Sequence, residues 1–555
     1  MKKKWWKNSI VYQIYPKSFQ DTNNDGIGDI RGIIQRLDYI KELGVDIIWL
    51  CPINESPMMD NGYDISDYYK VDPSFGTNED LEELIDEAKK RGIKILMDLV
   101  VNHCSSEHEW FKAAVRNPES KYASYFIIEE TNGDAPNNMR SYNAQSAWER
   151  IGDSNRFYFH SFSKEQPDLN WENPELRKEI IEMMKFWQKK GIAGFRIDAI
   201  GNIKKSKEAL TQKRIMTNET DGMASMENYV LMQDGIEDFL QELKEEVFDK
   251  YDMMTVAEVS VPEEKMERFI GDDGLFSMVF DFSYTDMDIE KRNGKEWKKS
   301  WAVCELKEKI FKSQYEIQKH GWGSPYLENH DQPRSVNKYI PKEELSYESK
   351  TALAALYFFL RGTPFIYQGQ EIGMENYPFK DERELRDPFA IDRFEQSLKN
   401  GENTEEDMDY FRARGRDNSR TPMQWDCNLY AGFSKVEPWI GINPNYKEIN
   451  VKTQVKEEHS IYHFYQKMIN LRKDSKYGKT LTFGDFEAIQ TEEETLIGYK
   501  RIDDKYEMII WVNFGNATVT LPDKIESENI LLNNRAEVAK TEILPYQALV
   551  VAKEK

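Results

Sequence analysis

The chain has 555 residues, of which 39% are hydrophobic and 13% aromatic, enough apolar material for several packed domains and too much for a small binding module or a disordered chain. It carries 98 acidic and 75 basic residues and a formal net charge of −23, a field that repels phosphate backbones, so we expect no nucleic-acid partner. The four cysteines form no CxxC pair and no clustered ligand spacing, which excludes a disulfide framework and a structural zinc site.

No apolar run reaches the ~18 residues that a membrane span requires. Polar residues also interrupt the N-terminal segment after its basic start, so no signal peptide is indicated. Together with the low cysteine content, this predicts a soluble cytoplasmic protein without a membrane partner. We expect it to act as a monomer.

Eight short runs rich in Ile, Val, Leu and aromatic residues recur along the chain and have the length of buried strands. They are Ile10–Pro16, Asp46–Ile53, Ile93–Val100, Gly194–Ile200, Met253–Val259, Met278–Ser283, Ser324–Asp331 and Thr363–Gly369. Segments with helical periodicity lie between them, namely Asn78–Arg91, Pro174–Lys190, Gly235–Tyr251 and Glu348–Leu360. Alternating strands and helices are typical of a parallel sheet, and eight such units predict an α/β fold of the (β/α)8 TIM-barrel type.

Two segments interrupt this alternation. Residues 104–170, after the third strand, are too long for a simple crossover and predict an inserted subdomain. An excursion at about 374–446 follows the eighth strand and should help to wall the active site. After a helical segment at 458–473, short strands such as Tyr506–Phe514 and Gln547–Ala552 predict a C-terminal antiparallel β-sandwich at 479–555. The barrel would then comprise residues 1–103 and 171–478.

Ionisable residues end four of the predicted strands, at the edge where such barrels place their active sites. They are His103 after the third strand, Arg196 and Asp198 in the fourth, Glu258 at the end of the fifth, and His330 with Asp331 in the seventh. Any one of them alone could be a satisfied polar group of the barrel core. Together they are what glycoside hydrolysis by two carboxyls needs: a guanidinium that keeps Asp198 ionised, and a second carboxyl, Glu258, that stays protonated as the acid.

Four strings, in the correct order, resemble the signature regions of the α-amylase superfamily, glycoside hydrolase family 13: DLVVNH at 98–103, GFRIDAI at 194–200, AE at 257–258 and ENHD at 328–331. The resemblance covers essentially the whole chain. It implies a β/α barrel with an inserted B domain and a β-structured C-terminal domain. It also implies roles for six residues: Asp198 as nucleophile, Glu258 as general acid/base, Asp331 as the carboxylate that orients substrate hydroxyls, and His103, Arg196 and His330 as supporting residues of the −1 subsite.

Two further motifs, QPDLN at 166–170 and RDNSRTPMQW at 416–425, resemble those of the oligo-1,6-glucosidase group. In these relatives, residues that match Asp60 and Tyr63 close the pocket. The resemblance implies that Tyr63 stacks on the terminal glucose, that Asp60 and Arg416 bind its O4 and O6 hydroxyls, and that Gln166 contacts substrate. A closed pocket implies exo-action at a non-reducing end.

The expected activity is therefore that of a retaining exo-acting α-glucosidase, which releases terminal α-1,6-linked glucose from short oligosaccharides such as isomaltose. Linkage preference stays open, with α-1,4 and α-1,2 bonds as alternatives. Ala199 follows the nucleophile where strict α-1,6-glucosidases resemble one another in having Val and α-1,4-preferring enzymes Thr, and alanine leaves the +1 side roomier. The loop at 203–228 has no assignable pattern, and we expect substrate choice to depend on it.

Other functions share these motifs. A trehalose-6-phosphate hydrolase would need a cationic +1 site, for which Lys204 and Lys205 are the candidates. A sucrose isomerase or transglucosidase is a second alternative, although the RLDRD string of the isomerases is absent and residues 280–287 read FDFSYTDM. A non-catalytic glycosidase-like interaction protein is the alternative from a different class. Such proteins have a transmembrane segment and have lost catalytic residues, and this sequence has neither feature.

A turn near the N-terminus carries oxygen ligands at alternate positions, with a glycine that allows the chain to bend: DTNNDGIGD at 21–29. This spacing is what a hard divalent cation requires. The family resemblance implies Ca²⁺ or Mg²⁺ held by Asp21, Asn23, Asp25, the Ile27 carbonyl and Asp29. The ion would be structural, because glycosidase chemistry needs no metal.

Overall fold

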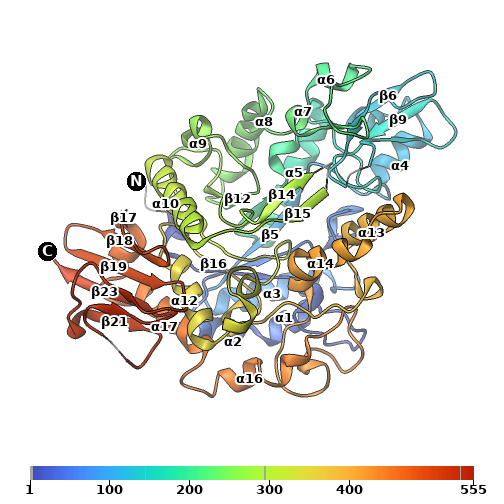
Figure 1. Cartoon of the computed structure of the whole chain (residues 1–555). Helices are drawn as coiled ribbons and strands as arrows, with labels where there is room; N and C mark the ends of the chain where they lie inside the picture. Colours follow the sequence, from blue (N-terminus) through green and yellow to red (C-terminus); the bar gives the residue numbers. More distant parts are fainter. Residues whose placement is uncertain (1–3, 144, 293–294, 538) are drawn as a thin grey trace.

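A parallel sheet of seven strands forms the centre of the molecule in the computed structural model, which describes residues 4–143, 145–292, 295–537 and 539–555; the other residues of the expected domains lie outside that description (Figure 1). In spatial order the strands are β13 (Met278–Val279), β12 (Met254–Ala257), β10 (Gly194–Asp198), β5 (Lys94–Val100), β2 (Ile47–Leu50), β1 (Val11–Ile14) and β16 (Phe365–Tyr367). Strands β1, β2, β10 and β12 are buried along their whole length, which explains their nearly continuous apolar sequences. The expected α/β barrel architecture is confirmed.

The seventh predicted strand, at 324–331, is not a regular strand. It lies between the two ends of the sheet and is joined to them by isolated hydrogen bonds. Pro325 O accepts the Phe365 N–H of β16 at 2.9 Å, and Ser324 Oγ donates to Val279 O of β13 at 2.6 Å. Proline has no N–H to donate, so a continuous ladder cannot form here. The segment still fills the gap between β13 and β16, and its polar residues follow it at the edge of the sheet where the active site is expected.

Helices pack on the outside of the sheet. The main ones are α1 (Ile30–Gln35), α2 (Leu37–Leu43), α3 (Asn78–Lys90), α5 (Pro174–Lys190), α8 (Ile236–Leu243), α9 (Glu263–Ile270), α10 (Val303–His320), α12 (Tyr347–Phe358) and α17 (Ile461–Lys473). Helix α5 shows why the predicted bounds hold: Asn173 caps its first turn, proline opens it, and Gly191 ends it in the left-handed region at φ 107°. The helix expected at 235–251 forms as α8 and continues as a π-helical turn at Lys244–Phe248.

The segment after β5 contains helix α4 (Glu109–Arg116) and a small antiparallel sheet of β6 (Ile128–Glu130), β9 (Arg156–Phe159) and β8 (Trp148–Arg150). We call residues 104–170 the insert. The loop at 203–228, which had no assignable pattern, docks on it. Strand β11 (Ala224–Ser225) pairs with β7 (Met139–Arg140), and the Asn138 side chain donates to Ile215 O and Gly222 O at 3.0 and 2.8 Å. The loop therefore extends the wall that the insert forms.

The C-terminal region is a two-layered antiparallel structure. One layer is the five-stranded sheet β17 (Asp485–Ile489), β18 (Leu496–Ile502), β19 (Tyr506–Asn513), β23 (Ala548–Glu554) and β21 (Ile530–Asn533), and the other is the pair β20 (Val519–Thr520) and β22 (Glu542–Ile543). A buried cluster that includes Trp511 and Ile543 lies between the layers. In Figure 1 the five-stranded sheet, in red, and the insert, in cyan, lie at opposite ends of the molecule.

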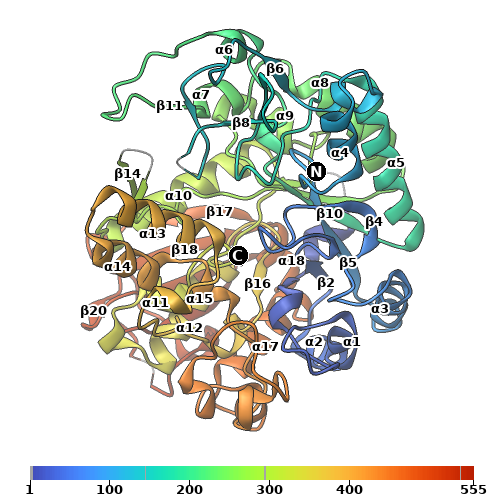
Figure 2. The same cartoon turned by 90° about the vertical axis from the view of Figure 1, so that its right-hand side faces the viewer.

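The excursion after β16 contains helices α13 (Pro388–Asn400), α14 (Thr404–Arg414) and α15 (Asp417–Arg420). A hairpin of β14 (Ile289–Arg292) and β15 (Lys295–Lys298) contacts it, since Glu296 accepts hydrogen bonds from Tyr410 and Arg393. Figure 2 shows α13 and α14 below the segment that carries β11, on the same side of the molecule. Among the helices of the described chain, none is both long and apolar enough to cross a membrane.

Candidate active site

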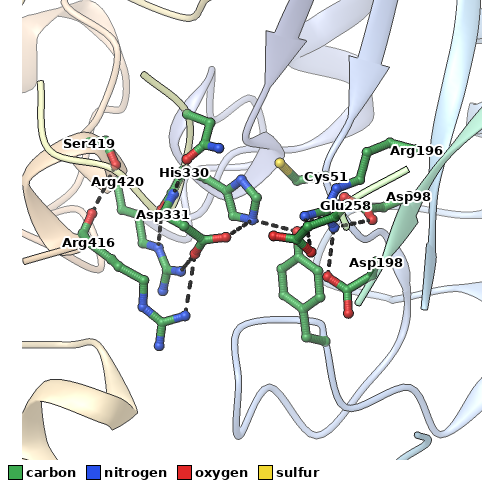
Figure 3. A network of polar contacts seen from close by, with 12 residues as sticks. Cys51, Asp98, Arg196, Asp198, Glu258, His330, Asp331, Arg416, Ser419 and Arg420 are labelled. Carbon is green, nitrogen blue, oxygen red and sulfur yellow. Dashed lines mark hydrogen bonds and ion pairs between the residues drawn. The ribbon is translucent and has the colours of Figure 1, made fainter. Parts of the chain in front are cut away.

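A buried guanidinium lies at the centre of the site (Figure 3). Arg196, on β10, is 1% exposed, and its Nη1 donates to Asp98 Oδ1 at 2.8 Å and to Asp198 Oδ1 at 2.7 Å. Its Nη2 lies 2.7 Å from Glu258 Oε2. Asp98 and Arg196 are direct partners in the register of β5 and β10, and Glu258 follows the next strand, β12. Parallel pairing of three consecutive sheet neighbours thus brings three carboxyls to one cation.

The two predicted catalytic carboxyls have different protonation behaviour. Burial raises the pKa of Asp198 to about 6, and Arg196 opposes this rise. Burial, reinforced by the charges of Asp198 and Asp331, raises the pKa of Glu258 to about 7. The Ala199 N–H donates to Glu258 Oε2 at 3.1 Å, from a residue held in the left-handed region at φ 41°. Near neutral pH, Glu258 therefore retains a proton more readily than Asp198, as an acid and a nucleophile require.

A third carboxyl, Asp331, is held in its ionised form. His330 Nε2 lies 2.9 Å from Asp331 Oδ2, while Arg420 and Arg416 contact Oδ1 at 2.9 and 3.3 Å. Gln13 Nε2 lies 2.9 Å from His330 Nδ1, which places the imidazole proton on Nε2, facing Asp331. Burial alone would raise the pKa of Asp331, but the imidazole and the two guanidinium groups hold it well below its usual range.

Tyr63 and Asp60 line the same cavity as the catalytic carboxyls. The Tyr63 hydroxyl lies 3.1 Å from Asp98 Oδ2 and 2.5 Å from His330 Nε2, and its ring stacks on the His330 ring with 5.4 Å between centroids. Gln166 Nε2 donates to Asp60 Oδ2 at 3.0 Å, and burial raises the pKa of Asp60 to about 6. Asp60, Tyr63 and Gln166 therefore present polar groups to the same cavity.

The structure brings the predicted catalytic and substrate-binding residues together. A cavity of about 320 Å³, which we call the inner cavity, is lined by nine of them: Asp60, Tyr63, His103, Gln166, Asp198, Ala199, Glu258, Asp331 and Arg416. Arg196 and His330 contact this lining from behind. His103 Nε2 lies 3.0 Å from Tyr63 O, so it also supports the pocket floor.

Three important residues escaped the sequence analysis. Asp98 opens the first signature string and could have been found there. Arg420 lies within the motif at 416–425 and could likewise have been found there. Asp387 carried no local signal, because its role depends on contacts between distant segments. Arg416 Nε and Nη2 bind both oxygens of Asp387, at 3.0 and 2.7 Å. Among the described residues Arg416 forms its ion pairs with Asp387 and Asp331, and none with Asp60, beside which it was expected to act.

A second cavity of about 680 Å³, the outer cavity, adjoins the inner one, and Tyr142 and Phe162 line both. The insert, the loop at 203–228, the β14–β15 hairpin and the excursion form its walls. Its acidic lining residues are Asp60, Glu165, Glu219, Glu227, Asp286, Glu296, Asp331, Asp387 and Asp392, and its basic ones are Arg140, Lys164, Lys291, Arg414 and Arg416. The balance of charge is therefore negative.

Lys204 and Lys205 do not form the cationic site considered above. Both line a separate cavity of about 200 Å³, away from the catalytic carboxyls. Lys205 Nζ pairs with Asp168 at 2.7 Å, and Lys204 Nζ pairs with Glu172 at 2.8 Å. Lys205 thus links the loop after β10 to the insert, and both lysines are ion-paired away from the catalytic carboxyls.

The loop after β1 carries the predicted cation ligands, Asp21, Asn23, Asp25, Ile27 and Asp29. Its carboxylates accept hydrogen bonds from the loop itself: Asp21 Oδ1 from the Asn24 N–H at 2.7 Å and Asp25 Oδ1 from the Ile27 N–H at 2.8 Å. Across the described ranges, no group of three or more His, Cys, Asp or Glu side chains has an arrangement that could hold a metal ion. The oxygen-only donor set still fits the chemistry of a hard cation.

Together, the barrel, the insert and the three carboxyls around a guanidinium define a glycoside hydrolase. The family model of the alpha-amylase catalytic domain matches residues 13–480, and the chain belongs to the α-amylase family. It is 42% identical to an oligo-1,6-glucosidase of Parageobacillus thermoglucosidasius, with 99% of each chain covered. Among solved structures, a trehalose-6-phosphate hydrolase of Bacillus licheniformis matches with 40% identity, complete coverage of both chains and a TM-score of 0.90. An isomaltulose synthase of a Klebsiella species matches with 36% identity, complete coverage of both chains and a TM-score of 0.93.

Proposed function

We propose that the protein is a retaining, exo-acting α-glucosidase that hydrolyses terminal α-1,6-linked glucose from the non-reducing end of short oligosaccharides such as isomaltose. The observation that carries this proposal is the shared guanidinium of Arg196, which contacts both Asp198 and Glu258 where these carboxyls line the inner cavity. The 42% identity to an oligo-1,6-glucosidase supports the α-1,6 preference.

The reaction proceeds in two steps. Asp198 attacks the anomeric carbon of the terminal glucose while Glu258 gives its proton to the glycosidic oxygen, so the bond to the leaving saccharide breaks and a β-glucosyl ester forms on Asp198. Glu258, now a carboxylate, takes a proton from water, and the hydroxide oxygen attacks the same carbon to release α-glucose and free Asp198. Retaining pairs lie about 5–5.5 Å apart, and binding to one guanidinium favours such proximity.

The charge of the outer cavity argues against the phosphorylated alternative. A trehalose-6-phosphate hydrolase must stabilise a phosphate beyond the bond that it cleaves. Nine acidic and five basic side chains line this cavity, and Lys291 on its rim is already ion-paired with Glu227. A dianion would meet net repulsion there, whereas a neutral saccharide would not. A trehalose-6-phosphate hydrolase and an isomaltulose synthase have the same fold as this protein. Any test of the proposed function must therefore include trehalose-6-phosphate and sucrose as substrates.

The test is glucose release from isomaltose, maltose, sucrose, trehalose and trehalose-6-phosphate by the purified protein, run beside Asp198→Asn. Isomaltose should give the highest kcat/KM, and Asp198→Asn should lower kcat by ~10⁴-fold or more while its circular dichroism spectrum stays unchanged. Cleavage of trehalose-6-phosphate alone would transfer the assignment to the phosphotrehalase, and isomerised products from sucrose would transfer it to the isomerase. A near-normal rate in Asp198→Asn would refute the nucleophile, and inactivity on every substrate would favour the interaction protein.

We also propose that the loop at 21–29 binds a structural Ca²⁺ or Mg²⁺, a proposal supported by its oxygen-only donor set. The chemistry above requires no metal. All four cysteines are free thiols in the structure, which supports our proposal that the protein works in the reducing environment of the cytoplasm. We propose that it does so as a monomer.

A further inference from the structure

Asp387 stands at the position from which an aspartate usually caps a helix, but its carboxylate is used elsewhere. It precedes α13, which the structure describes in full, and its side chain accepts no hydrogen bond from the first turn of that helix. Aspartate is favoured at such a position because it can accept that bond. Asp387 is 1% exposed and directs both oxygens to Arg416, 3.0 Å from Nε and 2.7 Å from Nη2. The carboxylate therefore serves a contact outside its own helix.

A second carboxylate holds the backbone at Asp387. Asp417 Oδ2 accepts the N–H groups of Arg386 and Asp387, at 2.7 and 3.0 Å. Asp417 is buried and directly follows Arg416 in the chain. The start of α13 and the start of α15 are thus joined twice, once through the side chain of Arg416 and once through that of Asp417. This double connection fixes the position of the Asp387 carboxylate.

Arg416 connects Asp387 to the catalytic carboxyls. Its side chain is 27% exposed and lines both cavities, and its Nη1 lies 3.3 Å from Asp331 Oδ1. Figure 3 shows this guanidinium and that of Arg420 directed at Asp331. An unrestrained arginine side chain has many rotamers, whereas a carboxylate that binds two of its nitrogens selects one orientation. Because Asp387 occupies Nε and Nη2, the Nη1 edge faces Asp331 and the inner cavity.

We propose that Asp387 is a positioning residue, which fixes the Arg416 guanidinium beside Asp331 and thereby sets the affinity of the inner cavity for a terminal glucose. This inference rests on the proposed glucosidase function, in which that cavity binds the glucose. Asp387 takes no part in bond cleavage. Since it acts through Arg416, its effect disappears when the guanidinium is removed.

The test is a double-mutant cycle of Asp387→Asn, Arg416→Gln and the double variant, with KM and kcat measured on p-nitrophenyl α-glucoside. Asp387→Asn should raise KM roughly 10-fold or more, the effect of a lost charge-assisted hydrogen bond. The value of kcat should change much less, because the guanidinium serves the bound sugar before and during the reaction. In the Arg416→Gln background, the same substitution should change KM by less than about twofold.

Asp407→Asn is the matched control. Asp407 lies in the same excursion, is also 1% exposed and also binds an arginine, since Arg393 Nε donates to its Oδ1 at 2.7 Å. Neither Asp407 nor Arg393 lines either cavity. This variant should lower the melting temperature, because it breaks a buried ion pair, and leave KM unchanged. If Asp387→Asn does not fold, Asp387→Glu takes its place in the cycle, because it keeps the charge but displaces the guanidinium.

Equal rises of KM in Asp387→Asn and Asp407→Asn would assign Asp387 to the stability of the excursion and overturn the proposal. Effects on KM that simply multiply in the double variant would overturn it as well, and so would an unchanged KM in Asp387→Asn. Failure of the proposed function gives a different result, namely no hydrolysis of any α-glucoside by the wild type. In that case calorimetric titration of the four proteins with glucose measures the same coupling, and equal affinities of the wild type and Asp387→Asn would refute the positioning role.

Discussion

The pKa values of the paired carboxyls Asp198 and Glu258 predict how the activity depends on pH. Glycoside cleavage needs Asp198 ionised and Glu258 protonated, and their pKa values are raised to about 6 and about 7. Below about pH 6, Asp198 takes up a proton and stops attacking; above about pH 7, Glu258 loses the proton that the leaving oxygen needs. We expect a bell-shaped dependence of kcat/KM on pH with its maximum between these limbs, measured with p-nitrophenyl α-glucoside from pH 4 to 9.

The variant Asp98→Asn should distinguish the acid limb of this pH profile from the basic limb. The charge of Asp98 contributes to the raised pKa of Asp198, so Asp98→Asn should move the acid limb to lower pH while the basic limb stays closer to its place. Because Asp98 also binds Arg196, the absolute rate should fall. An acid limb at the same pH in this variant would show that another group, and not Asp198, controls it.

His103, Asp198, Glu258 and Asp331 could be predicted because each lies at the end of a predicted strand. Asp60, Tyr63, Gln166 and Arg416 could be predicted only from the resemblance of their sequence to that of known relatives. Asp198 and Glu258 had to lie near one another once β10 and β12 were parallel neighbours. Asp387 could not be predicted in this way. It meets Arg416 from a segment 29 residues away in the chain, at the start of α13, and no periodicity links the two.

At the scale of elements, the loop between β1 and α1 predicts an effect of metal removal. If Ca²⁺ or Mg²⁺ binds there, EDTA should lower the melting temperature by about 2–3 °C, since a ligand at 100 times its Kd stabilises a native protein by about 2.7 kcal/mol. Asp25→Ala should abolish this sensitivity. Its kcat should match that of the wild type, because Asp25 lines neither cavity.

The measurement is differential scanning calorimetry of both proteins in EDTA, in CaCl₂ and in MgCl₂. The loop already satisfies its carboxylates by its own hydrogen bonds, such as those of Asp21 and Asp25, so it has a folded form without an ion. Equal melting temperatures of the wild type in all three solutions would contradict the metal proposal.

Strands and helices could be predicted from the sequence where a single physical cause, such as burial or helix capping, determines them. The buried strands of the sheet are recognisable from their β-branched and aromatic runs, and α5 from its caps. The segment at 324–331, SPYLENHD, was also expected to be a strand, but it has few apolar residues and Pro325 prevents a ladder. The loop at 203–228 could not be predicted, because its structure depends on pairing with β7 and on Asn138, both supplied by the insert.

Considered as a whole, the molecule places its C-terminal sheet far from the walls of the outer cavity. The insert, the loop at 203–228 and the excursion surround the outer cavity, while the C-terminal sheet packs on α12 and α17 at the far end (Figure 1). Changes at the C-terminal interface should therefore alter unfolding without altering catalysis. Tyr499 and Arg501 of the five-stranded sheet are completely buried. The expectation therefore concerns the whole interface between the C-terminal sheet and the barrel.

Arg501 provides the sharpest test of that contact. Its guanidinium donates to four backbone carbonyls, those of Phe359 on the barrel and of Leu481, Thr482 and Gly484 at the domain junction. Arg501→Leu leaves these buried oxygens unpaired, and we expect the free energy of unfolding to fall by about 3–5 kcal/mol, as when one partner of a buried polar cluster is removed. The value of kcat/KM should change less than about twofold, because surface and domain contacts remote from the site do not enter the transition state.

Urea unfolding followed by tryptophan fluorescence measures this change, with Arg535→Leu as the matched control. Arg535 also donates to a carbonyl, that of Pro545, but within the C-terminal domain. Its loss should shift the urea midpoint much less than the loss of Arg501. Similar midpoints in the two variants would mean that the domain junction contributes little to stability. A separate early transition confined to Arg501→Leu would instead show that the C-terminal domain detaches before the barrel unfolds, because the junction then no longer joins the two into one cooperative unit.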